Sequence, residues 1–82
     1  MGYHLGQIPK GELGEPSKIR EEFLEFQDAI KQDAKLMALC ELSDLLGAIE
    51  AYLEKHHPSI KLEDLLKMKS LTARAFQTGR RS

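Results

Sequence analysis

The sequence lacks several residue types, and these absences narrow the possible functions. Tryptophan and asparagine are absent, and the aromatic residues are 2 tyrosines and 3 phenylalanines. Cys40 is the single cysteine, so it forms no internal disulfide, and we expect a small buried side chain in a reducing compartment. No apolar run approaches the roughly 18 residues of a membrane span, and the N-terminus has no signal-peptide core. We therefore expect a cytoplasmic protein without a membrane partner.

The charge of the chain is nearly balanced. Its 12 basic and 13 acidic residues are interspersed and leave a net charge of −1. A chain of this kind lacks the basic surface of a nucleic-acid binder, so we expect no nucleic-acid partner. With 82 residues it forms one small domain. A core of this size is marginal in isolation, which favours burial against another subunit.

Glycine and proline divide the chain into an arm, a helical domain and a tail. Residues 1–16 contain 4 of the 6 glycines and 2 of the 3 prolines, which predicts an irregular N-terminal arm. Residues 17–79 form the predicted helical domain, and residues 80–82 are a short basic tail.

Apolar residues that recur with helical spacing predict three helices and no strand. The fold class is therefore all-α: an antiparallel helical bundle of three main helices, completed by oligomerisation. The predicted helices run from Ser17 to a turn at Asp33, from about Ala34 to Lys55, and from about Leu62 to Gln77.

Apolar stripes indicate which helix faces are expected to be buried. On the first helix Glu22 lies at the edge of the stripe and Glu25 about 60° further round, whereas Glu21 lies opposite. On the second helix Glu41 and Asp44 project from a flank of apolar and small residues, although surface acids usually lie on the polar strip. This second pair is therefore expected to have a function. The stripe of the first helix comprises Ile19, Phe23, Phe26 and Ile30.

Two acid pairs, Glu22 with Glu25 and Glu41 with Asp44, have the i, i+3 spacing that places both carboxylates on one helix flank. Glu25 and Glu41 each lie about eight residues from the turn, so a hairpin brings the pairs level, roughly 12 Å from the bend. Four such carboxylates repel one another unless a cation neutralises them. Their oxygens favour Mg²⁺ or Mn²⁺ over Zn²⁺, and no histidine follows at the spacing of a di-iron bundle. The alternative is a solvated acidic flank on a helical oligomer.

The residues around these pairs resemble a known family. The pattern Glu21-Glu22-x-x-Glu25, then 15 residues, then Glu41-x-x-Asp44 resembles the signature of the MazG-like all-α nucleoside triphosphate pyrophosphohydrolases. The flanking segments Lys18-Ile19-Arg20 and Leu42-Ser43-Asp44-Leu45-Leu46 are also similar to that family. From Ile8-Pro9-Lys10-Gly11 to Arg74-Ala75-Phe76 the chain resembles small phage-type members. Relatives of the family include dimeric dUTPases, dCTP pyrophosphatases and phosphoribosyl-ATP pyrophosphohydrolase.

The resemblance implies a Mg²⁺-dependent enzyme that is active as a homodimer or homotetramer. Such an enzyme hydrolyses a nucleoside triphosphate to the monophosphate and pyrophosphate, in nucleotide-pool control or house-cleaning. Carried over to this sequence, the metal ligands would be Glu22, Glu25, Glu41 and Asp44, with Glu21 as an additional acid. Glu25 and Glu22 would be catalytic, and Glu25 would orient or deprotonate the attacking water.

Cationic side chains would hold the remaining phosphate oxygens, because phosphoryl transfer needs positioning and charge neutralisation. Lys67 and Arg74 lie seven residues apart on one stripe of the third helix. Lys18 and Lys10 are further candidates for binding phosphate. Each of these bases is also compatible with an ordinary solvated role.

Two other functions remain open at this stage. One is a non-enzymatic helical dimerisation or adaptor module, which the apolar stripe of the first helix and the small size favour. The other is a degenerate family member that binds nucleotides without turnover. His4, His56 and His57 share no helical face, so we expect them in loops or on the surface.

Overall fold

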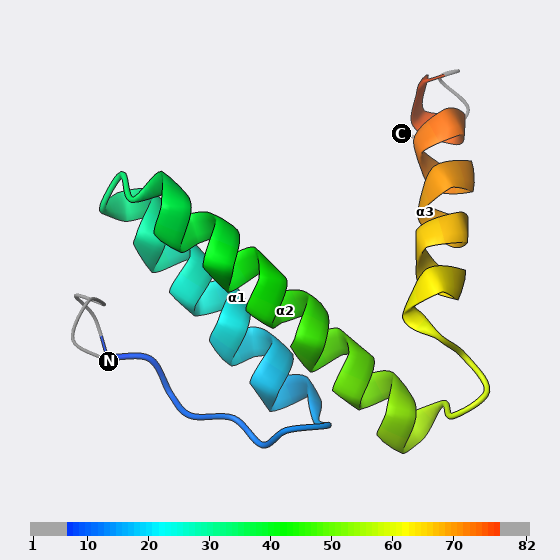
Figure 1. The fold of residues 1–82 in the computed structure, drawn as a ribbon, viewed down its shortest axis with the longest axis horizontal. Coiled ribbons are helices and arrows are strands. Elements are labelled where there is room, and N and C mark those ends of the chain that lie inside the picture. Colours follow the sequence, from blue (N-terminus) through cyan, green and yellow to red (C-terminus); the bar gives the residue numbers. More distant parts are fainter. Residues whose placement is uncertain (1–6, 78–82) are drawn as a thin grey trace.

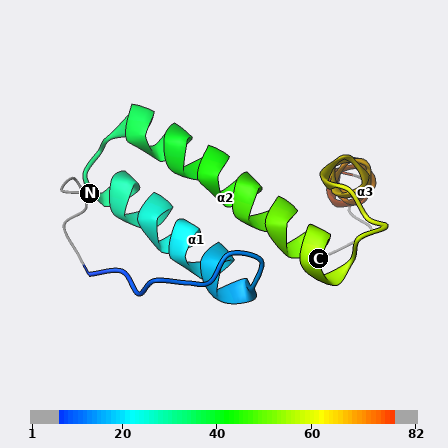
Figure 2. The ribbon, with the colours of Figure 1, turned by 60° about the horizontal axis from the view of Figure 1, so that its bottom comes forward.

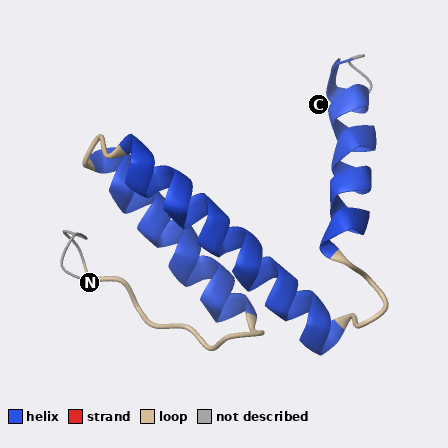
Figure 3. Cartoon of the chain, viewed as in Figure 1, coloured by secondary structure: helices blue, strands red, loops and turns tan. Residues whose placement is uncertain are grey.

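The computed structural model describes residues 7–77, and the side chains of residues 7–72. Within these residues it contains no strand, so the predicted all-α, three-helix fold is confirmed (Figures 1 and 3). None of the described helices is long and apolar enough to cross a bilayer. The helices are α1 (Pro16–Lys31), α2 (Lys35–His56) and α3 (Leu62–Gln77), and their ends lie within about one residue of the expected ones.

A short turn after α1 directs α2 back along it. α1 starts at Pro16, a position where the missing N–H of proline costs no helical hydrogen bond. In the turn Asp33 adopts a φ of 55°, a left-handed conformation that aspartate tolerates better than most residues. The Ala34 N–H donates to the Ala29 carbonyl at 3.0 Å and closes the turn. The result is an antiparallel hairpin of α1 and α2 (Figures 1 and 2).

The two helices of the hairpin pack through small side chains. Ala29 on α1 and Ala38 and Ala48 on α2 are all buried, as is Leu53 near the end of α2. Small side chains at a contact let two helix axes approach closely. The buried apolar residues of the hairpin are therefore mostly alanines.

Many large apolar side chains lie outside the hairpin interface. On α1, Phe23 and Ile30 are exposed, so the expectation that their stripe faces the core is wrong for these two residues. Cys40, expected to be buried, is also exposed, because it lies one helical turn from the exposed Leu36 on the same flank of α2. Completion of the fold by oligomerisation stays a prediction. Further exposed leucines on α2 are Leu39, Leu42 and Leu46.

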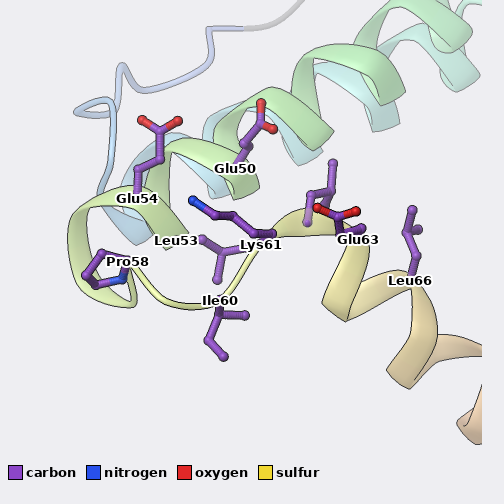
Figure 4. Close-up of a pocket in the computed structure, with 9 residues that line it drawn as sticks. Glu50, Leu53, Glu54, Pro58, Ile60, Lys61, Glu63 and Leu66 are labelled. Atoms are coloured by element: carbon purple, nitrogen blue, oxygen red, sulfur yellow. The ribbon is translucent and has the colours of Figure 1, made fainter.

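Among the described residues, α3 stands away from the hairpin and contacts it at the C-terminal end of α2 (Figures 1 and 2). Pro58 lies in the loop that follows α2, where it prevents the helix from continuing. Between the end of α2 and the start of α3 lies a cavity of about 390 Å³ (Figure 4). Its charged lining combines three acids with a single base: Glu50, Glu54, Glu63 and Lys61.

Candidate metal and phosphate site

The hairpin brings the acids of both helices into one cluster. Carboxylate oxygens of Glu22, Glu41 and Asp44 lie within 4.8 Å of one another, although they come from different helices. Oxygens of Glu21, Glu22 and Glu25 form a second group within the same distance. Glu22 belongs to both groups and therefore lies at the centre of the cluster. The two predicted pairs thus meet across the hairpin, as the residue count from the turn required.

Most of this cluster is buried in the hairpin. Glu41 is 1% exposed, Glu21 3% and Glu22 6%, while Glu25 is partly buried. Asp44 is exposed at the rim, so the expectation that both acids of its pair lie on the buried side holds only for Glu41. Burial disfavours the charged form of a carboxylate unless hydrogen bonds or cations compensate. The partners of each acid therefore show how it is compensated.

Only one of the two carboxylate oxygens of Glu22 has a partner that compensates for its burial. Its Oε2 lies 3.0 Å from Lys18 Nζ. Its Oε1 is buried and accepts no hydrogen bond from any described residue. The pKa of Lys18 is raised, mainly by the hydrogen bond to Glu22, against the opposing effect of partial burial. A buried oxygen without a partner, next to two further acids, indicates that Glu22 has capacity for a cation.

Glu25 shows the strain within the cluster most clearly. Burial, then the charge of Glu22, then the hydrogen bond and charge of Glu41 raise the pKa of Glu25 to about 7. Without a cation, the Glu25 carboxyl is therefore partly protonated near neutral pH. Groups with pKa values near neutrality are suited to accepting and releasing protons.

Glu21 is fully engaged with other parts of this chain. Its Oε1 accepts hydrogen bonds from the Gly11 N–H at 2.9 Å and from Lys18 Nζ at 3.2 Å. Its Oε2 lies 3.8 Å from Lys10 Nζ. Burial opposes ionisation, but the Gly11 hydrogen bond and Lys18 outweigh it and lower the pKa of Glu21. Glu21 lies opposite the apolar stripe of α1, and it is buried because this stripe is not the buried face of the helix.

The donor set of the cluster fits a hard divalent cation. Every group is a carboxylate, which matches the preference of Mg²⁺ and Mn²⁺ for oxygen ligands. The buried Oε1 of Glu22 supplies the site with an acceptor that lacks a partner among the described residues. His56 and His57 are exposed at the far end of α2, His56 with Nε2 3.3 Å from Glu15 Oε2, and His4 lies outside the described residues.

The cations expected to bind phosphate fall into two groups. Lys18 contacts the carboxylates of Glu21 and Glu22 in the cluster. Lys10 contacts the carboxylate of Glu21. Lys67 is on α3, which does not pack on α1, so one chain by itself does not bring Lys67 to the carboxylates. The side chain of Arg74 lies outside the described residues. The sequence favoured Lys67 over Lys10 because Lys67 and Arg74 share a stripe of the third helix. The arm has no periodicity from which the contact of Lys10 with Glu21 could be predicted.

Comparison of the chain with protein families, with curated proteins and with solved structures found no match in any of the three. The functional interpretation therefore depends on the residues of the site and on the resemblance of their spacing.

Proposed function

We propose that this protein is a Mg²⁺-dependent nucleoside triphosphate pyrophosphohydrolase that acts on a (d)NTP in nucleotide-pool control or house-cleaning. One observation carries the proposal: carboxylates of Glu22, Glu41 and Asp44 from two helices converge within 4.8 Å, and the buried Oε1 of Glu22 lacks a hydrogen-bond partner among the described residues. The resemblance of their spacing to the MazG-like family supports the same reaction. Mn²⁺ is the alternative cation by the same ligand chemistry.

In this proposal Glu22, Glu41, Asp44 and Glu25 would hold the metal through their carboxylate oxygens. When bound, Mg²⁺ would neutralise negative charge on the phosphates and make water a stronger nucleophile. Glu25 orients the attacking water and accepts its proton, a role that its partly buried position beside Glu22 and Glu41 supports. Water attacks one phosphorus, a phosphoanhydride bond breaks, and the products are the nucleoside monophosphate and pyrophosphate. Lys18 supplies a positive charge for the phosphate oxygens.

The proposed enzyme acts as a homodimer or homotetramer. The exposed leucines of α2 and the separation of α3 from the hairpin leave apolar surface that a second copy would cover. Assembly would also allow Lys67 and Arg74 from a neighbouring copy to approach the carboxylates. This interpretation keeps their predicted phosphate-binding role, which the described residues of one chain do not provide for Lys67.

The test is hydrolysis with a matched pair of variants. The full chain is incubated with Mg²⁺ and a panel of standard and modified nucleoside triphosphates, and released pyrophosphate is measured. Wild type should release pyrophosphate from at least one, Glu41→Gln should release none, and Glu50→Gln should behave as wild type. Glu50 is a suitable control because it is an exposed acid on the same helix. If the folded wild type releases no pyrophosphate from any substrate, the enzyme proposal fails.

The exposed apolar surface also favours a second candidate, a non-enzymatic dimerisation or adaptor module. Leu36, Leu39 and Leu71 are among the most exposed large apolar side chains and would suit a protein partner. In an adaptor Glu41→Gln would change no metal binding. A degenerate family member would instead bind a non-hydrolysable nucleotide analogue in calorimetry without turning over the nucleotide itself.

A further inference from the structure

The N-terminal arm is fastened to α1 at the edge of the carboxylate cluster. The Gly11 N–H donates to Glu21 Oε1 at 2.9 Å, and the Glu12 N–H donates to Ser17 Oγ at 3.0 Å. From this attachment the arm runs back beside α1 (Figures 1 and 2). Ile8 of the arm and Leu24 of α1 line the same small pocket. The arm is therefore part of the architecture around the acids.

Gly11 permits this attachment because no side chain fits there. A Cβ added to Gly11 would lie 2.3 Å from the Ser17 carbonyl oxygen and 2.5 Å from the Lys18 nitrogen. Both contacts are with backbone atoms, which cannot rotate away as a flexible side chain can. Any larger residue would push the arm, and with it Lys10, away from α1.

Glu21 and Glu22 are adjacent in the sequence, but their carboxylates differ in hydrogen-bond and ion-pair partners. Both oxygens of Glu21 face groups of this chain, namely the Gly11 N–H, Lys18 and Lys10. Glu22, in contrast, keeps a buried Oε1 without a hydrogen-bond partner among the described residues. Distance alone would allow both acids to bind a metal, since their oxygens lie within 4.8 Å. These partners leave an oxygen of Glu22 available for a metal, whereas the oxygens of Glu21 bind the arm and Lys18.

We propose that Glu21 is a positioning residue rather than a metal ligand, and that through Gly11 it holds Lys10 beside Lys18 to grip the phosphates of the substrate. This inference rests on the proposed function and deepens it. Lys18 Nζ lies between Glu21 Oε1 at 3.2 Å and Glu22 Oε2 at 3.0 Å, so it joins the anchor to the metal-binding acid. Lys10 is 90% exposed and can turn from Glu21 to a phosphate oxygen while Gly11 keeps its backbone in place.

The first experiment separates anchor from ligand without using activity. Binding of Mg²⁺ alone to the full chain is measured by calorimetry for wild type, Glu21→Gln and Glu41→Gln. We expect Glu21→Gln to bind with less than about a tenfold loss of affinity and Glu41→Gln to show no binding. Equal loss in both variants would make Glu21 a ligand and overturn the inference, while wild-type hydrolysis would leave the proposed function standing. A wild type that neither binds the metal nor hydrolyses nucleotide would overturn both.

The second experiment examines Lys10 with the preferred nucleotide and saturating Mg²⁺. Lys10→Ala should raise KM about tenfold, the effect of one lost charge-assisted contact, and change kcat by less than about twofold. The matched control is Lys35→Ala, which removes an exposed lysine at the opposite end of the hairpin and should change neither constant. A Lys10→Ala variant with wild-type KM would overturn the phosphate role of Lys10.

The third experiment tests whether Gly11 and Glu21 act through Lys10. Gly11→Ala should raise KM as Lys10→Ala does, and the double variant should be no worse than either single variant. Glu21→Gln should raise KM less than Glu21→Ala, because the amide oxygen still accepts the Gly11 hydrogen bond. Independent, multiplying effects of the Gly11 and Lys10 changes would contradict a shared mechanism. Helix content measured by circular dichroism confirms that each variant is folded.

Discussion

Glu25 offers a sharp test of the carboxylate cluster, because its protonation changes in an accessible pH range. Burial, then the charge of Glu22, then the hydrogen bond to Glu41 raise its pKa from 4.5 to about 7 in the folded chain. Between these two values the folded chain holds a proton that the unfolded chain releases. Without a divalent cation, the free energy of unfolding should therefore fall as pH rises through this window.

The magnitude follows from the two pKa values. A pKa raised from 4.5 to about 7 corresponds to at most about 3–4 kcal/mol. Because Glu25 is only partly buried, solvent screening reduces the expected loss to about 1–2 kcal/mol. The pKa values of Glu15 and Glu21 are lowered, so their contributions are present above 4.5 and are lost as pH falls below it. Glu25 is thus the shifted acid expected to act between the two values.

The assay is urea unfolding in EDTA at two pH values, about 5 and about 7.5, at a fixed protein concentration. Wild type should lose stability between them, whereas Glu25→Gln should not, because its amide carries no charge and can still donate to Glu41. Glu50→Gln, which removes an exposed acid from the same hairpin, should keep the wild-type difference. Added Mg²⁺ should abolish the wild-type loss, because the cation would replace the proton.

Two results would refute this reasoning. One is a wild-type stability in EDTA that stays level or rises between the two pH values. The other is a Glu25→Gln variant with the same pH dependence as wild type. Either result would mean that Glu22 and Glu41 do not hold a proton on Glu25.

Two further predictions concern packing and the backbone. Ala48→Leu should destabilise the hairpin by about 1–3 kcal/mol, because Ala48 is buried. The control is Gly47→Ala, which has open space at the added Cβ and should stabilise the hairpin by about 0.5–1 kcal/mol. Unchanged stability of Ala48→Leu in urea unfolding would contradict the tight packing at this position. Gly14→Ala should cost about 1 kcal/mol or more, because Gly14 has a φ of 90° and its added Cβ would lie 3.0 Å from Lys55 Cδ; unchanged thermal stability would show that the arm near Gly14 adopts another conformation.

The heights of the acid pairs could be predicted because a helix has a fixed rise per residue. Counting residues from the turn at Asp33 places Glu25 and Glu41 level once the hairpin is assumed. Counting residues does not give the distance between the acids across the hairpin. In the structure, carboxylate oxygens of Glu22, Glu41 and Asp44 lie within 4.8 Å of one another. The arm could not be predicted in this way, because its path depends on single contacts such as that of Gly11 with Glu21.

The sequence by itself determined the three helices, their ends and the level at which the four acids meet, because helical periodicity and the turn are local properties. Only the tertiary structure decided which helix faces are buried. The sequence pattern favoured the large apolar residues, yet the hairpin buries Ala29, Ala38 and Ala48 with Glu21 and Glu41, and it leaves Phe23 exposed. The physical reason is that helices with small side chains at their contact can approach closely. That approach places two carboxylate-bearing faces against each other, and it makes neutralisation by a cation the central question about this protein.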